Sequence, residues 1–253
     1  MQRRIEAFLL AATFVGAALG SSSARAGDLY LAGSMFVSSA EGSSGGSTDF
    51  GFSPSGSDSD SSPAWGGALG FELGLDEPAP SASEWAAPWK LRVELEGLGG
   101  RDYELHTRGG DGFFSDTVSW TVMQNLWLDV PMSGAVTSLF GRVPLLEPLS
   151  FYVGAGLGLA INEMKATDNV SRAKTTTYGL TWQGGAGFGY AFTDLVTFLI
   201  GYRYQDLGRV ASNLKTAPDQ DPIGRFRLDL AAHELTTGLR VSFYSVPIPT
   251  LEH

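Results

Sequence analysis

The chain has no cysteine, only three histidines and no long apolar run beyond its first residues. Without cysteine it has no disulfide, no thiol nucleophile and no cysteine-based metal site. After the N-terminal region, no apolar run approaches the roughly 20 residues that a membrane-spanning helix needs. If the protein lies in a membrane, it must cross the membrane as β-strands.

The N-terminus carries the pattern of an export signal. Arg3 and Arg4 precede an uncharged, mostly apolar stretch at 8–20, and an Ala-Arg-Ala sequence follows at 24–26. This stretch is too short to span a bilayer but is typical of a signal peptide. We therefore expect residues 1–26 to be removed on export. The absence of cysteine excludes a lipoprotein anchor at the cleavage site.

The charge of the chain is acidic. The formal net charge is −10 at pH 7, and removal of the predicted signal peptide brings it to about −12. Bulk electrostatics therefore argues against binding to nucleic acid or to anionic lipid. The mature part has a length typical of a single all-β domain.

Strict alternation is the strongest pattern in the chain. In the segment WKLRVELEG at 89–97, apolar residues alternate without a fault with charged ones. A period of two predicts a β-strand, because successive side chains point to opposite faces. The same alternation recurs in seven further segments, at 28–38, 64–75, 118–130, 151–162, 178–190, 196–205 and 234–243. Each is near the 9–11 residues of a tilted bilayer crossing, and eight is an even number, as bacterial outer-membrane barrels require.

The composition of the two rows indicates which face is inside. Glycine-rich rows lie opposite bulky rows, as a narrow eight-stranded interior requires, and aromatic residues gather near strand ends on the apolar row. The charges on the other row nearly balance, which suits a closed lumen. We expect these charges to form a structural network in the lumen: Glu72, Lys90, Arg92, Glu94, Glu96, Asp129, Arg203 and Arg240.

The predicted fold is therefore an all-β, eight-stranded antiparallel up-and-down transmembrane β-barrel. A secreted soluble β-sandwich, with the apolar row as its core, is the alternative. If the turn at 76–88 closes symmetrically, Glu72 lies across from Arg92 as an ion pair.

The connections between the predicted strands alternate in character. Four polar segments, at 39–63, 100–116, 163–176 and 206–225, are expected to be outer loops. The other three, at 76–88, 131–148 and 191–194, would face the periplasm, and 131–148 is long enough for a short helix.

The last strand contains an irregularity. Phe226, Leu228 and Leu230 have the opposite phase to Leu235 and the residues after it. A one-residue bulge near 231–233 would reconcile the two phases. Alternatively, the part before the bulge belongs to the loop.

Three short stretches carry a resemblance to a known family. They are FYVGAGLG at 151–158, GYRY at 201–204 and the closing LRVSF at 239–243. The chain resembles the small outer-membrane β-barrels of Gram-negative bacteria, the porin-like surface antigens and opacity-type proteins. The resemblance implies a barrel over residues 27–243 in the cell outer membrane, followed here by a short tail at 244–253.

The resemblance also implies partners. Leu239, Val241 and Phe243 are similar to the signal by which barrel-assembly machinery recognises its substrates. The other expected partners are outer-membrane lipids and lipopolysaccharide, and an unidentified host or cell-surface ligand. Nucleic acid is not expected.

Few residues suit catalysis. His106 and His233 lie near the predicted outer ends, and Ser115, Asp116 or Glu234 could complete a His-Ser-acid site of the kind found in lipid-modifying barrels. The simpler interpretation is that these histidines are solvated loop residues.

Two further motifs carry no predicted site. Asp58 and Asp60 lie at alternate positions in a serine-rich stretch, but the glycine and distal glutamate of a calcium loop are missing. The glycine-rich stretches within strands are followed by no helix, so they are not phosphate loops.

We therefore expect no catalytic, cofactor-binding or metal-binding residue. The predicted function is a structural or surface-contact role through four outer loops, with a lumen filled by side chains. The alternatives are a lipid-modifying enzyme with a rim site and a narrow pore.

Overall fold

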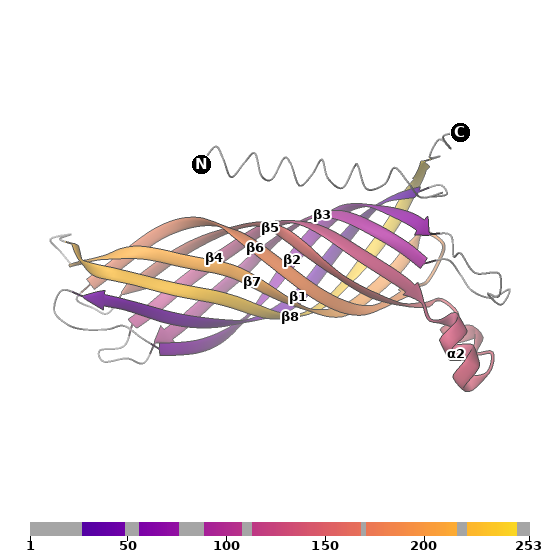
Figure 1. The fold of residues 1–253 in the computed structure, drawn as a ribbon, viewed down its shortest axis with the longest axis horizontal. Helices are drawn as coiled ribbons and strands as arrows, with labels where there is room; N and C mark the ends of the chain where they lie inside the picture. Colours follow the sequence, from indigo (N-terminus) through magenta and orange to yellow (C-terminus); the bar gives the residue numbers. More distant parts are fainter. Residues whose placement is uncertain are drawn as a thin grey trace.

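A computed structural model describes residues 27–48, 56–75, 89–107, 113–167, 171–216 and 222–246. They form a closed antiparallel barrel in which each strand pairs with its neighbours in sequence and the eighth pairs with the first (Figure 1). The strands are β1 (Gly27–Thr48), β2 (Gly56–Leu75), β3 (Trp89–Thr107), β4 (Phe113–Pro131), β5 (Leu149–Thr167), β6 (Ser171–Ala191), β7 (Val196–Thr216) and β8 (Pro222–Val246). The eight-stranded up-and-down prediction is confirmed.

Along about half of the length of the barrel, the apolar row of each strand faces outward. Leu69, Leu126 and Leu157 are exposed by 50%, 48% and 67%, whereas Arg92 on the opposite row is only 2% exposed. A soluble sandwich would bury the first set and expose the second. The sandwich alternative is therefore wrong.

The strands are much longer than a bilayer crossing. They contain 19 to 25 residues each, so the expected outer loops at 39–63, 100–116, 163–176 and 206–225 are largely strand. Between the described strands at that end lie only 49–55, 108–112, 168–170 and 217–221. Polar and small residues are frequent in these expected loops, and such residues resemble loop because they lack the hydrophobic contrast by which alternation is recognised.

The barrel divides into two parts along its axis. We call the end that carries Gly27 and Val246 the base. The band is the part of the barrel next to the base. Its lower limit is at Trp89, which faces outward, and its upper limit is at Trp65. On β2 the band therefore contains the residues from Trp65 to Leu75. Such a length suits one bilayer crossing.

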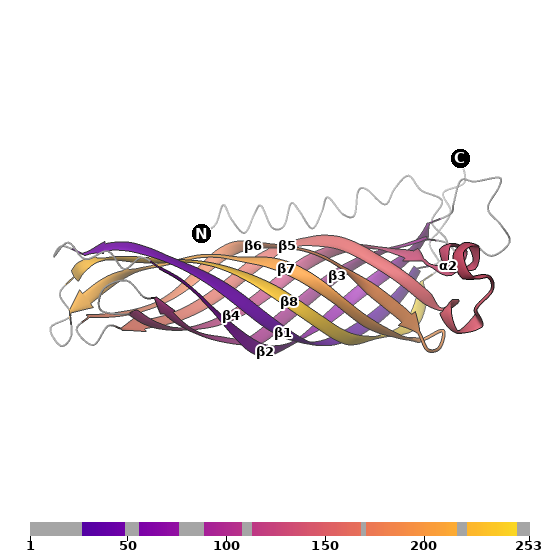
Figure 2. The ribbon, with the colours of Figure 1, turned by 90° about the horizontal axis from the view of Figure 1, so that it is seen from below.

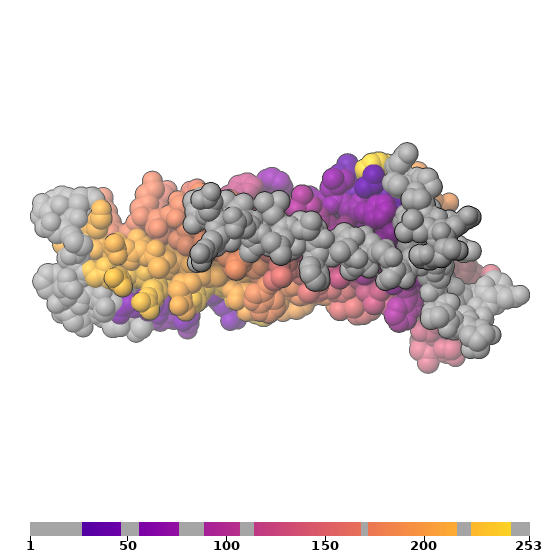
Figure 3. Space-filling model, turned by 45° about the horizontal axis from the view of Figure 1, so that its top comes forward, coloured from indigo at the N-terminus to yellow at the C-terminus, as the bar shows by residue number. Residues whose placement is uncertain are grey.

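We call the remainder of the barrel the crown. It comprises 39–48, 56–64, 100–107, 113–119, 162–167, 171–177, 207–216 and 222–232. Of the exposed large apolar side chains in the described residues, only Phe114 belongs to the crown. The crown forms the left half of the rod in Figure 3, where the outer ends of β7 and β8 are orange to yellow.

Two glycine bulges change which side chains face inward. Gly100 in β3 and Gly208 in β7 have positive φ angles, 77° and 81°, and the strand register shifts at both places. After the first bulge, Arg101, Tyr103 and Leu105 face the lumen. Glycine is favoured at both positions because it alone adopts this conformation without a Cβ penalty.

The bulge expected near 231–233 in β8 is absent. Phe226 and Leu228 lie in the same inward row as Glu234, and all three are fully buried. The alternative that this part belongs to a loop is also wrong, because β8 begins at Pro222. The apparent phase change in the sequence arises because the inward face of β8 is apolar at Phe226 and Leu228 and charged at Glu234.

Among the described residues, one α-helix is present, and it lies at the base. In the long connection between β4 and β5, α2 (Ser133–Phe140) is followed by the 3-10 helix η2 (Pro144–Leu146), so the expected short helix is present. Figures 1 and 2 show α2 beyond the end of the barrel wall. Leu139, Phe140 and Leu145 are more than 70% exposed there. No described helix is both long and apolar enough to span a membrane.

Candidate functional site

The lumen of the band, up to its junction with the crown, holds the chemically distinctive residues, and they form two layers. The layer nearer the base is centred on Asp129 in β4. Arg92 donates from Nε to Asp129 Oδ2 (2.9 Å), and Arg240 donates from Nη1 to the same oxygen (3.0 Å). All three side chains are at most 7% exposed. Two cations and one anion thus share a site that none could occupy alone without a large desolvation cost.

Glu94 and Glu72 balance the charge of this layer. Glu94 accepts from Arg92 (2.5 Å), from Tyr30 Oη (2.7 Å) and from Trp127 Nε1 (2.8 Å). Glu72 accepts from the half-exposed Lys90 (2.5 Å) and lies 3.2 Å from Arg240. Each buried carboxylate therefore has a cationic partner.

The expected pair between Glu72 and Arg92 is half right. The two residues are direct partners in the β2–β3 ladder. Their ion pairs nevertheless go elsewhere, to Lys90 and Arg240 for Glu72 and to Asp129 and Glu94 for Arg92. In a narrow closed barrel, side chains reach across the lumen, and a cross-strand pair is only one of several available contacts.

The second layer is centred on Glu234 in β8. Its carboxylate accepts from Arg101 Nε (2.8 Å), from Ser38 Oγ (2.8 Å) and from Arg203 Nε. Arg203 also donates to Glu96 Oε1 (2.9 Å). The guanidinium groups of Arg101 and Arg203 lie 5.2 and 4.5 Å from the ring centre of Phe36, a cation–π arrangement.

Neutral side chains complete the hydrogen bonding of this layer. Asn125 donates to Glu96 Oε2 (2.8 Å), and Gln183 donates to Asn125 Oδ1 (2.7 Å). Gln205 accepts from Arg101 Nη2 (2.5 Å). Residues from six strands, β1, β3, β4, β6, β7 and β8, thereby connect into one network that fills the cross-section.

Sequence reasoning missed Arg101 and Glu234 as members of this network. Arg101 was assigned to a loop because the Gly99-Gly100 bulge hides its phase. Glu234 was in the inward row already, with Gly238 and Arg240, and this position was the signal that could have identified it. With these two, the buried network has five cations and five carboxylates.

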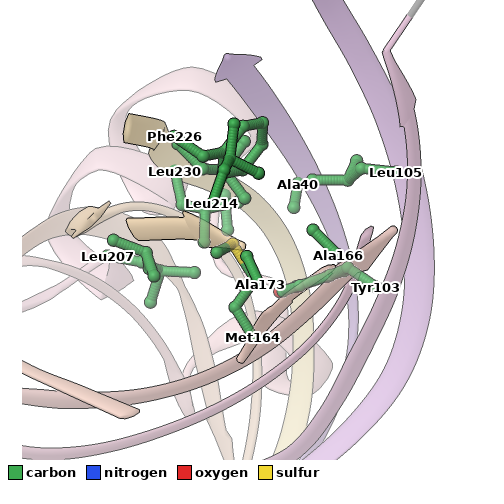
Figure 4. Packing of buried hydrophobic residues seen from close by; sticks show 13 residues of the cluster. Ala40, Tyr103, Leu105, Met164, Ala166, Ala173, Leu207, Leu214, Phe226 and Leu230 are labelled. Carbon is green, nitrogen blue, oxygen red and sulfur yellow. The ribbon is translucent and has the colours of Figure 1, made fainter. Parts of the chain in front are cut away.

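Above the second layer, the crown has an apolar interior. Figure 4 shows thirteen side chains that converge from several strands: Ala40, Tyr103, Leu105, Met164, Ala166, Ala173, Leu207, Val210, Leu214, Phe226, Leu228, Leu230 and Ala232. None is more than 4% exposed. The outer half of the lumen is therefore a packed hydrophobic core.

The free space in the lumen is small. A cavity of about 550 Å³ opens at the base and ends among Glu72, Asp129 and Arg240. Between the two charged layers, a further cavity lined in part by Arg92, Glu96 and Arg203 has a volume of about 70 Å³. This space suits a few water molecules and no larger solute.

The residues considered for a rim catalytic site do not assemble. His106 faces outward and packs edge-on against Phe114, whereas Ser115 faces the lumen and donates to the carbonyl of Leu105. Asp116 faces outward, opposite Glu104 in the ladder.

The remaining two candidates are also engaged elsewhere. His233 Nδ1 is 2.5 Å from Tyr202 Oη on the outer face, and Glu234 is held by two arginines inside. In the part of the chain that the structure describes, the side-chain hydrogen bonds of Ser115 and Glu234 therefore go to groups other than a histidine.

Asp58 and Asp60 have a structural role that sequence reasoning missed. The β2–β3 ladder is registered only as far as Trp65. Beyond it, Asp60 Oδ2 accepts from the backbone N–H of Glu104 (2.8 Å), and Asp58 Oδ2 accepts from that of His106 (2.6 Å). The two carboxylates therefore accept hydrogen bonds from backbone N–H groups that would otherwise bond to the carbonyls of a neighbouring strand.

The model of one protein family, the outer membrane protein beta-barrel domain, matches residues 7–243. The chain belongs to this family. Its fold and its place in the outer membrane follow from that membership, and the apolar exterior of the band is its lipid-facing surface.

Several solved barrels are similar in fold. Neisserial surface protein A is 14% identical over 83% of this chain and 97% of its own, with a TM-score of 0.37. OprG from Pseudomonas aeruginosa is 15% identical over 87% and 97%, with a TM-score of 0.42. Ail of Yersinia pestis is 12% identical over 83% and 99%, with a TM-score of 0.36. No curated protein matches the chain.

Proposed function

We propose that this outer-membrane protein is a non-catalytic barrel with a closed lumen, whose crown projects from the cell as a surface for contact. The observation that carries the proposal is the double seal of the lumen. A solute would have to pass both a network of five ion-paired cations and five carboxylates and a packed apolar cluster. Either obstacle alone is sufficient to close a barrel of eight strands.

Ion conductance tests the closed lumen. The folded protein, reconstituted in a planar bilayer, is expected to give no unitary current steps. A steady conductance that depends on the salt concentration would contradict the proposal in favour of a narrow pore. Folding is checked in the same preparation by the change in gel mobility on boiling, which closed barrels show.

Mass spectrometry of lipid A tests the absence of catalysis. Lipid A from cells that produce the protein is expected to match lipid A from cells without it. A new or missing acyl chain that disappears in a His106→Ala or His233→Ala variant would favour the enzyme alternative.

Single cysteines test the orientation cleanly, because the chain has none of its own. In intact cells, a membrane-impermeant maleimide is expected to label Ser59→Cys, which faces outward in the crown. It should not label Leu228→Cys inside the crown, nor Ser138→Cys in α2 until the cells are permeabilised. The reverse pattern for the Ser59 and Ser138 variants would show that the crown faces the periplasm.

Two sequence expectations remain part of this proposal. Residues 1–26 would be cleaved, so the mature protein from the outer membrane should begin at Gly27 by mass spectrometry. Leu239, Val241 and Phe243, which form an outward row exposed by 50%, 42% and 53%, would be read by the barrel-assembly machinery. Replacing Phe243 with serine should then slow insertion in cells more than folding of the purified chain in detergent.

A further inference from the structure

The outer surface of the crown is divided by charge. On β3 and β4, three outward carboxylates lie close together: Asp102, Glu104 and Asp116. We call these three residues the acidic face. On β6 to β8, five outward basic side chains gather around one hollow: Arg172, Lys174, Lys215, Arg225 and Arg227. We call these five residues the basic face.

The acidic face places like charges side by side. Glu104 and Asp116 are direct partners in the β3–β4 ladder, and like charges in that position repel each other. Lys165 is the neighbour of Asp116 on β5, but among the described residues none of the three carboxylates forms an ion pair. Cations supplied by another molecule would therefore stabilise this face.

The basic face is uncompensated in the same way. None of its five cations has a carboxylate partner among the described residues, whereas Arg209 on the same side donates to both oxygens of Asp229 (2.6 and 3.1 Å). The five cations surround a hollow of about 740 Å³, where the β6–β7 register is interrupted between Arg172 and Trp182. This hollow lets carboxylate side chains of another molecule approach several cations at once.

The two faces lie on opposite sides of the barrel and at similar levels. In the closed order of the strands, β3 is four strands from β7, and β4 is four strands from β8. Glu104, Asp116 and Arg225 each lie three residues from the outer ends of their strands. Their side chains point sideways from the wall, because alternate residues of a strand face outward. A copy that is displaced sideways, without rotation, would therefore bring its acidic face against the basic face of its neighbour.

We propose that the basic face binds the acidic face of a second copy of this chain, so that neighbouring crowns join side by side in the plane of the membrane. The contact joins two different surfaces. Because these surfaces are opposite each other on one molecule, repeated contacts give an open row of copies rather than a closed pair. The inference rests on the proposed function only in that the crown stands clear of the lipid, and it names a partner for the surface of the crown.

The membrane makes weak ion pairs sufficient for this contact. Exposed ion pairs contribute little individually. Copies in one membrane, however, already share their orientation and their height, so their association costs less rotational and translational freedom than association in solution. The net charge of −10 does not prevent the contact. At physiological salt the Debye length is about 8 Å, so only the surfaces that face each other interact strongly.

Disulfide cross-linking between copies tests the contact, because the native chain has no cysteine. His106→Cys lies on β3 beside the acidic face, and Asn213→Cys lies on β7 beside the basic face; both positions face outward. The two variants are produced in the same cells, and the isolated outer membranes are oxidised. We expect disulfide-linked dimers from the mixture and almost none from either variant alone. Equal dimer yields from a single variant, or no dimer from the mixture, would overturn the proposal.

Reversal of charge tests whether the two faces recognise each other. In the copy with the cysteine on β3, Glu104→Lys/Asp116→Lys should lower the yield of the mixed dimer, by about fivefold for each ion pair lost. In the copy with the cysteine on β7, Arg225→Glu/Arg227→Glu should have the same effect. Combining the two reversed copies restores opposite charges across the contact and should recover the dimer. A combined yield as low as that of either reversal alone would overturn the proposal.

The matched control is Glu163→Lys, which reverses an outward charge of the crown on β5, between the two faces. It should leave the yield of the mixed dimer unchanged, and a loss equal to that of the acidic-face variant would overturn the proposal. Soluble heparin serves as the probe for a different occupant. If no mixed dimer forms, and heparin binds the wild type but not Arg225→Glu/Arg227→Glu, the basic face binds a soluble polyanion instead.

The two proposals fail separately. The gel shift on boiling shows that each variant is folded. Ion conductance and maleimide labelling report the closed lumen and the orientation without any contact between copies. A closed, correctly oriented barrel that gives no mixed dimer would overturn the contact between copies and leave the proposed function in place.

Discussion

The band and the crown are built from the same eight strands with the opposite arrangement of polarity. In the band, Leu69 and Leu157 face outward and Arg92 and Glu234 face inward; in the crown, Arg227 faces outward and Leu228 inward. The band has the pattern of a membrane barrel, and the crown has that of a soluble protein with a hydrophobic core. Alternation therefore identifies a strand, but the surrounding medium decides which row is apolar, and that medium changes halfway along each strand.

The largest effect is expected in the band, at its most enclosed carboxylate. Glu234→Gln leaves Arg101 without its carboxylate in a site that is 0% exposed. Removing one partner of a buried ion pair costs about 3–5 kcal/mol, and the urea midpoint of unfolding should fall accordingly. Glu163→Gln, an outward-facing carboxylate of the crown, is the control and should change the stability by no more than about 0.5 kcal/mol.

The next effect compares two leucines on β8. Leu228→Ala leaves a cavity in the crown core and should cost about 3 kcal/mol of unfolding free energy. Leu235 faces outward, so lipid fills the space that Leu235→Ala leaves. This variant should therefore lose only the free energy of transferring the removed atoms, without the cost of a cavity. Equal costs in urea titrations would show that the crown interior is not packed as a core.

Introducing arginine on the outer surface distinguishes the two media directly. Leu239→Arg, midway along the lipid-facing row of β8, should cost about 2–4 kcal/mol. Ala211→Arg is exposed on the crown and should cost almost nothing. The measurement is folding into vesicles at increasing urea. A large penalty at position 211 would place lipid, rather than water, around the crown.

A smaller effect is expected at the bulge that reverses the phase of β3. Gly100 has φ 77°, and a Cβ there would also press on Trp65. Gly100→Ala should therefore cost about 1–2 kcal/mol. Gly97→Ala, three residues earlier, meets no atom within 4 Å and serves as the control in the same denaturation assay.

The smallest effect is expected where β2 and β3 meet in the crown, at the hydrogen bonds from the β3 amides to Asp58 and Asp60. Asp60→Ala removes the acceptor for the Glu104 amide and should cost about 1 kcal/mol. Amide exchange at Glu104 should become faster. Asp60→Asn keeps an oxygen acceptor and should protect that amide nearly as well as wild type does. Equally fast exchange in both variants would mean that the charge, rather than the acceptor, holds β2 and β3 together there.

The band could be predicted from the sequence because its two rows differ strongly in hydrophobicity. Trp89 to Glu96 alternate without a fault, and the turn at 76–88 gave the correct register of Glu72 opposite Arg92. The crown could not be predicted in the same way. Its inward row includes Gly42 and Ser44, and its outward row includes Ser43, so the contrast between rows disappears.

The ion pairs were beyond sequence reasoning for a geometric reason. Register fixes which residues are neighbours on the wall, but partners across the lumen depend on the barrel closing. Arg101 and Glu234 lie 133 residues apart and on strands that are not adjacent. The inward phase of Glu234 was visible in the sequence, and its partner was hidden behind a two-glycine bulge.

The wide sequence separation of these ion pairs has a consequence for biogenesis. Asp129 with Arg240, Glu96 with Arg203 and Arg101 with Glu234 each join the first four strands to the last two. A sheet of six strands would therefore expose uncompensated charges to the lipid, with no partner to neutralise them. Intermediates that stop short of closure are penalised, so insertion should be an all-or-none event in which β7 and β8 supply the counter-charges at the final step.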